Sequence, residues 1–155
     1  MGYDIGMERE LVGLLCLYAI GALGAVVESV REVVKKDNPF GIVRRYFFLG
    51  VFVWGDAAIL GLFWLGAVIW TVMVGEGELF LLVISVFWIV RSMGEVQYWL
   101  NQQYSSRERN RPRDLWGSKW FGGDSIWFVY QVFWQCMTVI SSVWTIYLIR
   151  DLVTC

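Results

Sequence analysis

The sequence predicts an all-α, polytopic integral membrane protein whose four helices cross a bilayer as a compact bundle. Hydrophobic residues make up 57% of the 155 residues and charged residues 17%, a balance outside the range of water-soluble domains. Four apolar runs are each long enough for the roughly 20 residues that a bilayer requires. A backbone in lipid must satisfy its own hydrogen bonds, so we expect these runs to be helices in one domain, 1–155.

The four expected spans cover residues 11–33, 47–73, 79–103 and 125–149. The N-terminus is acidic and no small-residue cleavage site follows the first apolar run, so we expect that span to be retained. Helix-breaking residues separate the spans. An Asn-Pro pair interrupts the connection 34–46, two glycines flank Glu76 in a tight hairpin, and a proline interrupts the connection 104–124.

Lysine and arginine are unevenly distributed among the connections. The two basic connections, with their flanking residues, hold Arg31, Lys35, Lys36, Arg44, Arg45, Arg107, Arg109, Arg111, Arg113 and Lys119. The opposite side holds Arg9 and Arg150. By the positive-inside rule, the basic connections are cytoplasmic and both termini lie on the non-cytoplasmic side. Short loops with this charge pattern are typical of a bacterial or archaeal cytoplasmic membrane.

The connection 104–124 mixes cations with aromatic residues in the manner of an interfacial segment. Its candidate membrane-surface residues are Arg107, Arg109, Arg111, Arg113, Trp116, Lys119 and Trp120. We expect them to lie among anionic lipid headgroups at the cytoplasmic face. Arginines that only enforce the topology remain an equal alternative.

Ionisable side chains within a span are costly, and each is a candidate for a functional site. Together with nearby polar residues, the candidates for binding an ion, a proton or a substrate are Glu28, Asp56, Arg91, Glu95, Tyr98, Gln131 and Gln135. Arg91, Glu95 and Tyr98 follow one another at steps of four and three residues, so they share one helical face. Gln131 and Gln135 begin a second polar stripe on the fourth span.

Depth along the helices suggests how these residues meet. Counting from the turn at Glu76 sets Asp56 level with Glu95 in the cytoplasmic half of the bundle. Arg91 can neutralise one of the two carboxylates, and the other then needs a cation, a proton or water. This predicts a proton- or cation-responsive site open to the cytoplasm. A buried triad that merely fixes the helix register is the alternative.

Several activities are excluded by composition. The chain has no histidine and its cysteines form no ligand-spaced pair, so we expect no metal site and no cofactor. A net charge of -1 gives no reason to expect nucleic acid as a partner. The carboxylates occur singly, and we therefore do not expect an enzyme.

Two functions remain open. One is a protomer of an oligomeric proton- or cation-linked transporter or channel, because four helices leave little room for a pathway in one chain. The other is a non-catalytic accessory or assembly subunit that docks on partner helices of a larger membrane complex. Its docking face would be the small residues of the first span, Gly13, Gly21, Gly24 and Ala25, which allow close helix approach.

Overall fold

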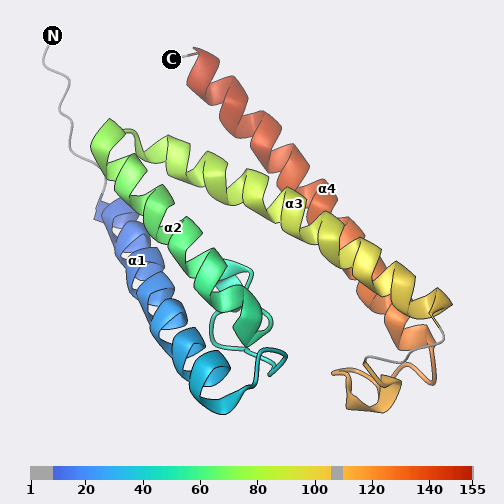
Figure 1. The fold of residues 1–155 in the computed structure, drawn as a ribbon. Coiled ribbons are helices and arrows are strands. Elements are labelled where there is room, and N and C mark those ends of the chain that lie inside the picture. The colour runs from blue at the N-terminus through green and yellow to red at the C-terminus, as the bar shows by residue number, and fades with distance from the viewer. Residues whose placement is uncertain (1–8, 106–109, 155) are drawn as a thin grey trace, which may run out of the picture. The chain divides into compact units, whose positions relative to one another are not determined.

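The computed structural model describes residues 9–105 and 110–154 (Figure 1). Their element order is α1 (Arg9–Val30), η1 (Arg31–Lys35), η2 (Phe47–Leu49), α2 (Trp54–Val74), α3 (Gly77–Tyr104), η3 (Pro112–Asp114) and α4 (Ser125–Thr154). The described residues are helical apart from turns, coil and one isolated antiparallel bridge between Ile42 and Val53. Four helices are long and apolar enough to cross a membrane, which confirms the predicted all-α class.

The helix bounds differ most from expectation at the second span. That span was predicted from residue 47, whereas α2 begins at Trp54 after an extended Val53. The helix ends at Gly75, whose φ of 80° is left-handed and whose N–H donates to the Thr71 carbonyl at 2.9 Å. Glycine favours this conformation because it has no Cβ. The tight turn predicted around Glu76 therefore ends α2 and leads directly into α3.

The chain divides into two compact units, Met1–Val83 and Ile84–Cys155. In unit 1, α1 and α2 pack through small residues. Ala22, Ala25 and Ala57 are fully buried, and an added Cβ at Gly61 would lie 2.8 Å from the Ala22 carbonyl oxygen. Small residues let the two backbones approach closely, so this interface depends on the absence of side-chain bulk.

An aromatic cluster fills the core of unit 1. The ring of Tyr18 lies 4.6 Å from Trp64 and 5.2 Å from Phe80, both with edge-to-face geometry. Trp64 and Phe80 are fully buried. Edge-to-face contacts suit the quadrupoles of aromatic rings. The cluster thus joins α1, α2 and the first turn of α3.

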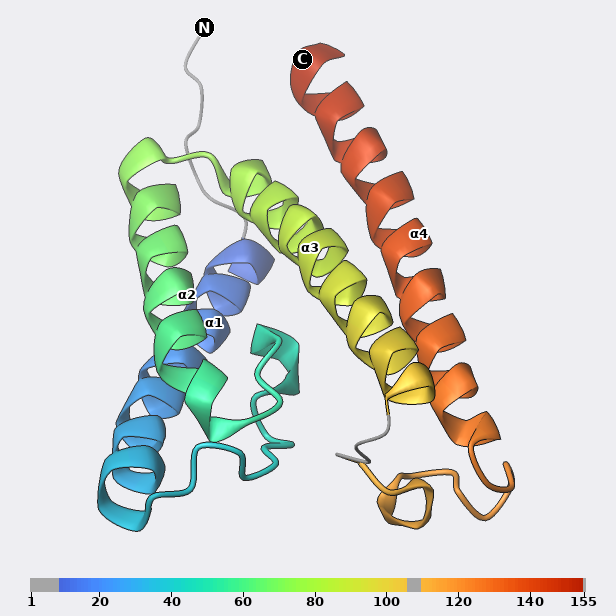
Figure 2. The ribbon, with the colours of Figure 1, turned by 45° about the vertical axis from the view of Figure 1, so that its right-hand side comes forward.

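The connection between α1 and α2 folds back along these helices as a hairpin, residues 41–54 (Figure 2). The Val43 N–H donates to the Phe52 carbonyl at 2.8 Å, and the Trp54 N–H donates to the Gly41 carbonyl at 3.2 Å. The tip contains η2 and ends at the left-handed Gly50. The hairpin thus replaces the basic loop and the first turns of the second span that the sequence predicts.

In unit 2, α3 and α4 pack through aromatic and small polar residues. Trp88 stacks on Trp134 with ring centroids 6.3 Å apart, and Trp99 lies 4.7 Å from Tyr130. The Ser85 hydroxyl donates to the Ser141 carbonyl at 2.9 Å. These contacts form a seam along α3 and α4 that contains polar groups.

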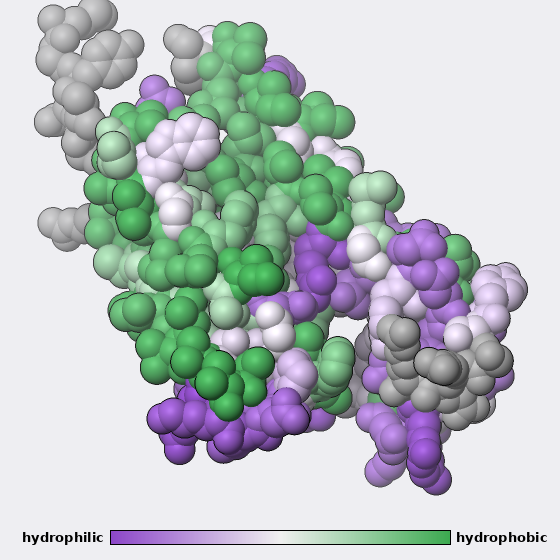
Figure 3. All heavy atoms as spheres, in the orientation of Figure 1, coloured by the Kyte–Doolittle hydropathy of each residue, from purple (hydrophilic) through white to green (hydrophobic). Residues whose placement is uncertain are grey.

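Much of the helical surface is apolar. Figure 3 shows hydrophobic side chains along the flanks of the helices and hydrophilic ones near the connections. Each long helix exposes large aliphatic residues, of which Ile20, Ile59, Val90 and Ile146 are examples. Such continuous exposure would be unfavourable in water.

Candidate functional site

The candidate site in unit 2 is centred on Arg91 and Glu95 of α3. The Arg91 Nη2 lies 3.3 Å from the Glu95 Oε1, in an ion pair one helical turn apart. Their side chains are 23% and 15% exposed, so the pair is largely withdrawn from the surface. Both residues sit near the middle of the 28-residue helix. The predicted common face of Arg91 and Glu95 is therefore confirmed.

Two buried polar groups of α3, close to this pair in the sequence, lack a hydrogen-bond partner among residues 9–105 and 110–154. They are the Ser92 hydroxyl and the Trp99 indole N–H. Ser92 is fully buried and Trp99 is 6% exposed. An unsatisfied buried polar group costs about 1–3 kcal/mol, so each is a place for water, a ligand or a further polar group.

Sequence reasoning missed Ser92 and Trp99. A signal was present, because Ser92, Glu95, Trp99 and Gln102 follow one another at steps of three and four and share one face. Gln102, at 4% exposed, also belongs to the buried part of this face.

The α4 side of the seam is only partly as predicted. Gln131 is half-buried and its amide oxygen accepts a hydrogen bond from the Gln103 Nε2 at 2.7 Å. Gln135 is exposed instead. The buried face of α4 contains Trp134, Ser141 and other residues that lie between the predicted polar positions. The predicted polar stripe of α4 is therefore rotated relative to the seam.

Tyr98 lies at the edge of the seam, where it binds the following connection. Its hydroxyl accepts a hydrogen bond from the Asn110 side-chain amide. The carbonyl of Asn110 in turn accepts one from the Trp127 indole at 3.0 Å. Tyr98 therefore links α3 to the start of α4 through this connection.

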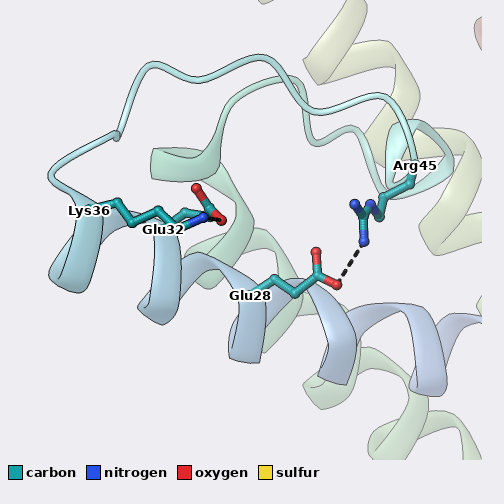
Figure 4. Close-up of polar contacts among 4 residues, drawn as sticks. All are labelled: Glu28, Glu32, Lys36 and Arg45. Atoms are coloured by element: carbon teal, nitrogen blue, oxygen red, sulfur yellow. Dashed lines mark hydrogen bonds and ion pairs between the residues drawn. The ribbon is translucent and has the colours of Figure 1, made fainter.

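Glu28, another predicted site residue, is paired within unit 1 (Figure 4). Its Oε1 lies 2.8 Å from the Arg45 Nη1, and Arg45 belongs to the hairpin. One turn farther along the chain, Glu32 pairs with Lys36 at 2.6 Å. The carboxylate of Glu28 thus anchors the hairpin to α1.

The glycine face predicted on the first span is largely covered by the same hairpin. An added Cβ at Gly21 would lie 2.5 Å from the ring of Phe48, and one at Gly24 would lie 2.8 Å from the Tyr46 hydroxyl. A Cβ at Gly13 would meet nothing within 4 Å. The space at Gly21 and Gly24 is therefore occupied by the chain's own hairpin and not left for a partner helix.

Asp56 lies in the first turn of α2 and is half-buried. A carboxylate at this position interacts favourably with the N-terminal end of the helix dipole. Asp56 belongs to unit 1, whereas Arg91 and Glu95 belong to unit 2. The predicted alignment of Asp56 with Glu95 therefore stays a prediction.

The predicted membrane-surface segment is described from Asn110 onward, and Arg107 and Arg109 lie outside the described residues. A hollow of ≈ 710 Å³ is lined by Arg111, Pro112, Arg113, Ser118, Lys119, Phe121 and Gly123. Trp116 and Trp120 are 79% and 73% exposed. Cations and aromatic side chains thus occur together on this connection.

Within the described ranges, no group of three or more acidic, cysteine or histidine residues could hold a metal ion. No protein-family model matches the sequence, and comparisons with curated proteins and with solved structures find no match. The chemistry of the side chains therefore carries the functional interpretation.

Proposed function

We propose that this chain is a multi-pass membrane protein in which α1 to α4 cross the bilayer and both termini lie on the non-cytoplasmic side. The length of the helices supports this: at 1.5 Å per residue, the 21 residues of α2 extend about 31 Å, close to the thickness of the hydrocarbon core. The exposed aliphatic flanks and the basic connections support it as well.

On this proposal, the hairpin re-enters the membrane. Trp64, midway along α2, donates from its Nε1 to the Leu49 carbonyl at the tip, so the tip would lie near mid-depth. Non-helical backbone is tolerated there where protein buries and satisfies it. Tyr18 donates to the Phe48 carbonyl at 3.3 Å, and Leu49 and Val51 are fully buried. The hairpin meets that requirement.

We further propose that the chain is a protomer of an oligomeric proton- or cation-linked transporter or channel. The observation that carries this proposal is the half-buried Arg91–Glu95 pair in mid-helix, on the same helix as the unsatisfied polar groups of Ser92 and Trp99. Ionisable residues inside a membrane mark ion and proton pathways by default. An ion pair that keeps 23% and 15% of its side chains exposed can still exchange a proton or a cation with its surroundings.

A proteoliposome flux assay tests this proposal with gradients of protons and of monovalent cations. We expect Glu95→Gln to abolish flux, because the amide can neither carry a proton nor balance a cation. The matched control is Glu78→Gln, which removes the same charge from an exposed position in the first turn of α3. Asp56→Asn tests whether the second carboxylate contributes. Equal flux in wild type and Glu95→Gln, with both proteins folded, would contradict the proposal.

An accessory or assembly subunit is the second candidate, and a specific observation favours it. An added Cβ at Gly13, Gly66 or Gly94 meets nothing within 4 Å, so α1, α2 and α3 each retain an uncovered glycine. Uncovered glycines in membrane helices allow another helix to approach closely. A stable homo-oligomer after purification would favour the transporter. Aggregation that is relieved by a co-expressed membrane partner would favour the subunit.

A further inference from the structure

We propose that the connection before α4 binds the phosphate of one anionic phospholipid headgroup in the hollow lined by Arg111, Arg113 and Lys119. The inference rests on the membrane-crossing part of the proposed function but not on transport. It differs from a general attraction to the bilayer surface, because it assigns one lipid molecule to one defined binding site.

The hollow concentrates positive charge. Three of its lining residues are cations, and among the described residues that line it none is acidic. Arg113 makes a loose contact with Asp114, at 3.9 Å and with both side chains mostly exposed. Arg111 and Lys119 form no ion pair with any residue in the described ranges. A phosphodiester would supply the missing negative charge, and guanidinium groups can bind its oxygens in bidentate fashion.

The surroundings of the hollow suit a lipid. Trp116 and Trp120 lie edge to face with ring centroids 5.7 Å apart, and both are largely exposed. Amphipathic indole rings prefer the interface between headgroups and acyl chains. Phe121 adds an apolar wall to the hollow itself. A free phosphate ion would bind to the cations but would make no favourable contact with these rings.

Hydrogen bonds hold the connection against the N-terminal end of α4. The Tyr130 hydroxyl donates to the Trp116 carbonyl at 3.2 Å, and the Trp127 indole donates to the Asn110 carbonyl at 3.0 Å. If α4 crosses the bilayer, its first residues lie at the membrane interface. The hollow is then placed at headgroup level, where basic pockets bind anionic lipids.

The test is native mass spectrometry of the full chain purified in mild detergent. It is titrated with short-chain phosphatidylglycerol, with the matching phosphatidylcholine, and with inorganic phosphate. We expect one phosphatidylglycerol to be retained per chain, in preference to phosphatidylcholine. In Arg111→Gln/Lys119→Gln its apparent affinity should fall about 25-fold, since each cation near an anionic headgroup changes affinity by about fivefold.

The matched control is Arg31→Gln/Arg44→Gln, which removes two exposed cations from the other basic connection. We expect it to change retention by about twofold or less, because neither Arg31 nor Arg44 lines the hollow. Equal losses in the two double variants would overturn the inference in favour of diffuse attraction. Displacement of the lipid by inorganic phosphate at similar concentration would assign the site to free phosphate instead.

The two proposals fail separately. Circular dichroism of each variant establishes that its helices are intact. Absence of flux with normal lipid retention would contradict the transporter and leave the lipid site standing. Normal flux with equal retention of both lipids would contradict the lipid site and leave the transporter standing. A chain that alkaline washing extracts from membranes would remove the common basis of both proposals.

Discussion

At the scale of single residues, the indole of Trp64 shows how a buried donor holds non-helical backbone in place. The side chain is fully buried, and its Nε1 lies 3.0 Å from the Leu49 carbonyl oxygen. The neighbouring carbonyl of Phe48 accepts from Tyr18 in the same way. A carbonyl in a turn has no helical partner, so these two side chains supply the donors that the backbone lacks. The hairpin tip depends on them.

We therefore expect Trp64→Phe to destabilise unit 1 while preserving most of the ring packing. The substitution leaves the Leu49 carbonyl buried without its donor, which costs about 1–3 kcal/mol. Unfolding in mixed detergent, followed by circular dichroism, measures the change. Trp70→Phe, at a position 62% exposed on the same helix, is the control and should change stability little. Equal effects of the two substitutions would contradict the role assigned to the indole.

Glu28 shows the limit of what single residues in the sequence can predict. Its cost within a span was recognised from the sequence, and with it the need for a partner. The partner, Arg45, is 17 residues away and had been counted only as a topology signal. The two side chains meet because the intervening chain turns back along α1. No local spacing rule predicts such a pair.

At the scale of elements, the hairpin is where the sequence-based boundaries differ from the structure. Residues 46–53, Tyr-Phe-Phe-Leu-Gly-Val-Phe-Val, are almost entirely apolar and continue without interruption into α2. Hydrophobicity cannot separate a short apolar hairpin from the first turns of a membrane helix. The aromatic and β-branched residues around Gly50 were the available signal for extended structure. The remaining helices are more uniformly apolar, and their existence was correctly predicted.

The packing of α1 on α2 makes a prediction that a pair of glycines on one helix can test. Gly61→Ala would place a Cβ 2.6 Å from Val26 Cγ2 and 2.8 Å from the Ala22 carbonyl oxygen. Because one of these atoms is backbone, the helices must shift, and we expect a loss of about 1–3 kcal/mol. Gly66→Ala meets nothing within 4 Å and should be neutral or stabilise by up to about 1 kcal/mol.

Steric trapping or detergent-induced unfolding measures the free energy of unfolding of both glycine variants under one set of conditions. The difference between them reports helix contact, because both gain the same helix propensity. If Gly61→Ala were as stable as Gly66→Ala, the close approach of α1 and α2 would be wrong. If both were strongly destabilised, Gly66 would instead face a partner helix, as the accessory-subunit reading expects.

At the scale of the whole molecule, sequence patterns identified the helices and part of the polar seam, but not its full composition. The spacing of Arg91 and Glu95 predicted a shared face, which their ion pair confirms. The involvement of Ser92 and Trp99 depends on which face of α3 is buried, and that depends on packing with the rest of the fold. Glycine spacing likewise predicted a close contact on the first span without revealing that the hairpin makes it.

The orientation of the whole chain gives the last prediction. The positive-inside rule places the connection after α1 in the cytoplasm and the turn between α2 and α3 outside. Two single-cysteine proteins test this, Phe40→Cys and Glu76→Cys, in a chain whose Cys16, Cys136 and Cys155 are replaced by alanine. Both positions are exposed, with Phe40 at 86%, so a membrane-impermeant maleimide can reach either thiol from the correct side.

In right-side-out vesicles we expect labelling at Glu76→Cys and protection at Phe40→Cys, with the pattern reversed in inside-out vesicles. Permeabilised vesicles, in which both should react, control for thiol reactivity. Labelling of both positions from one side would mean that α2 does not cross the bilayer. A complete reversal would keep the four spans but invert the chain, and the basic connections would then face away from the cytoplasmic lipids that the headgroup site requires.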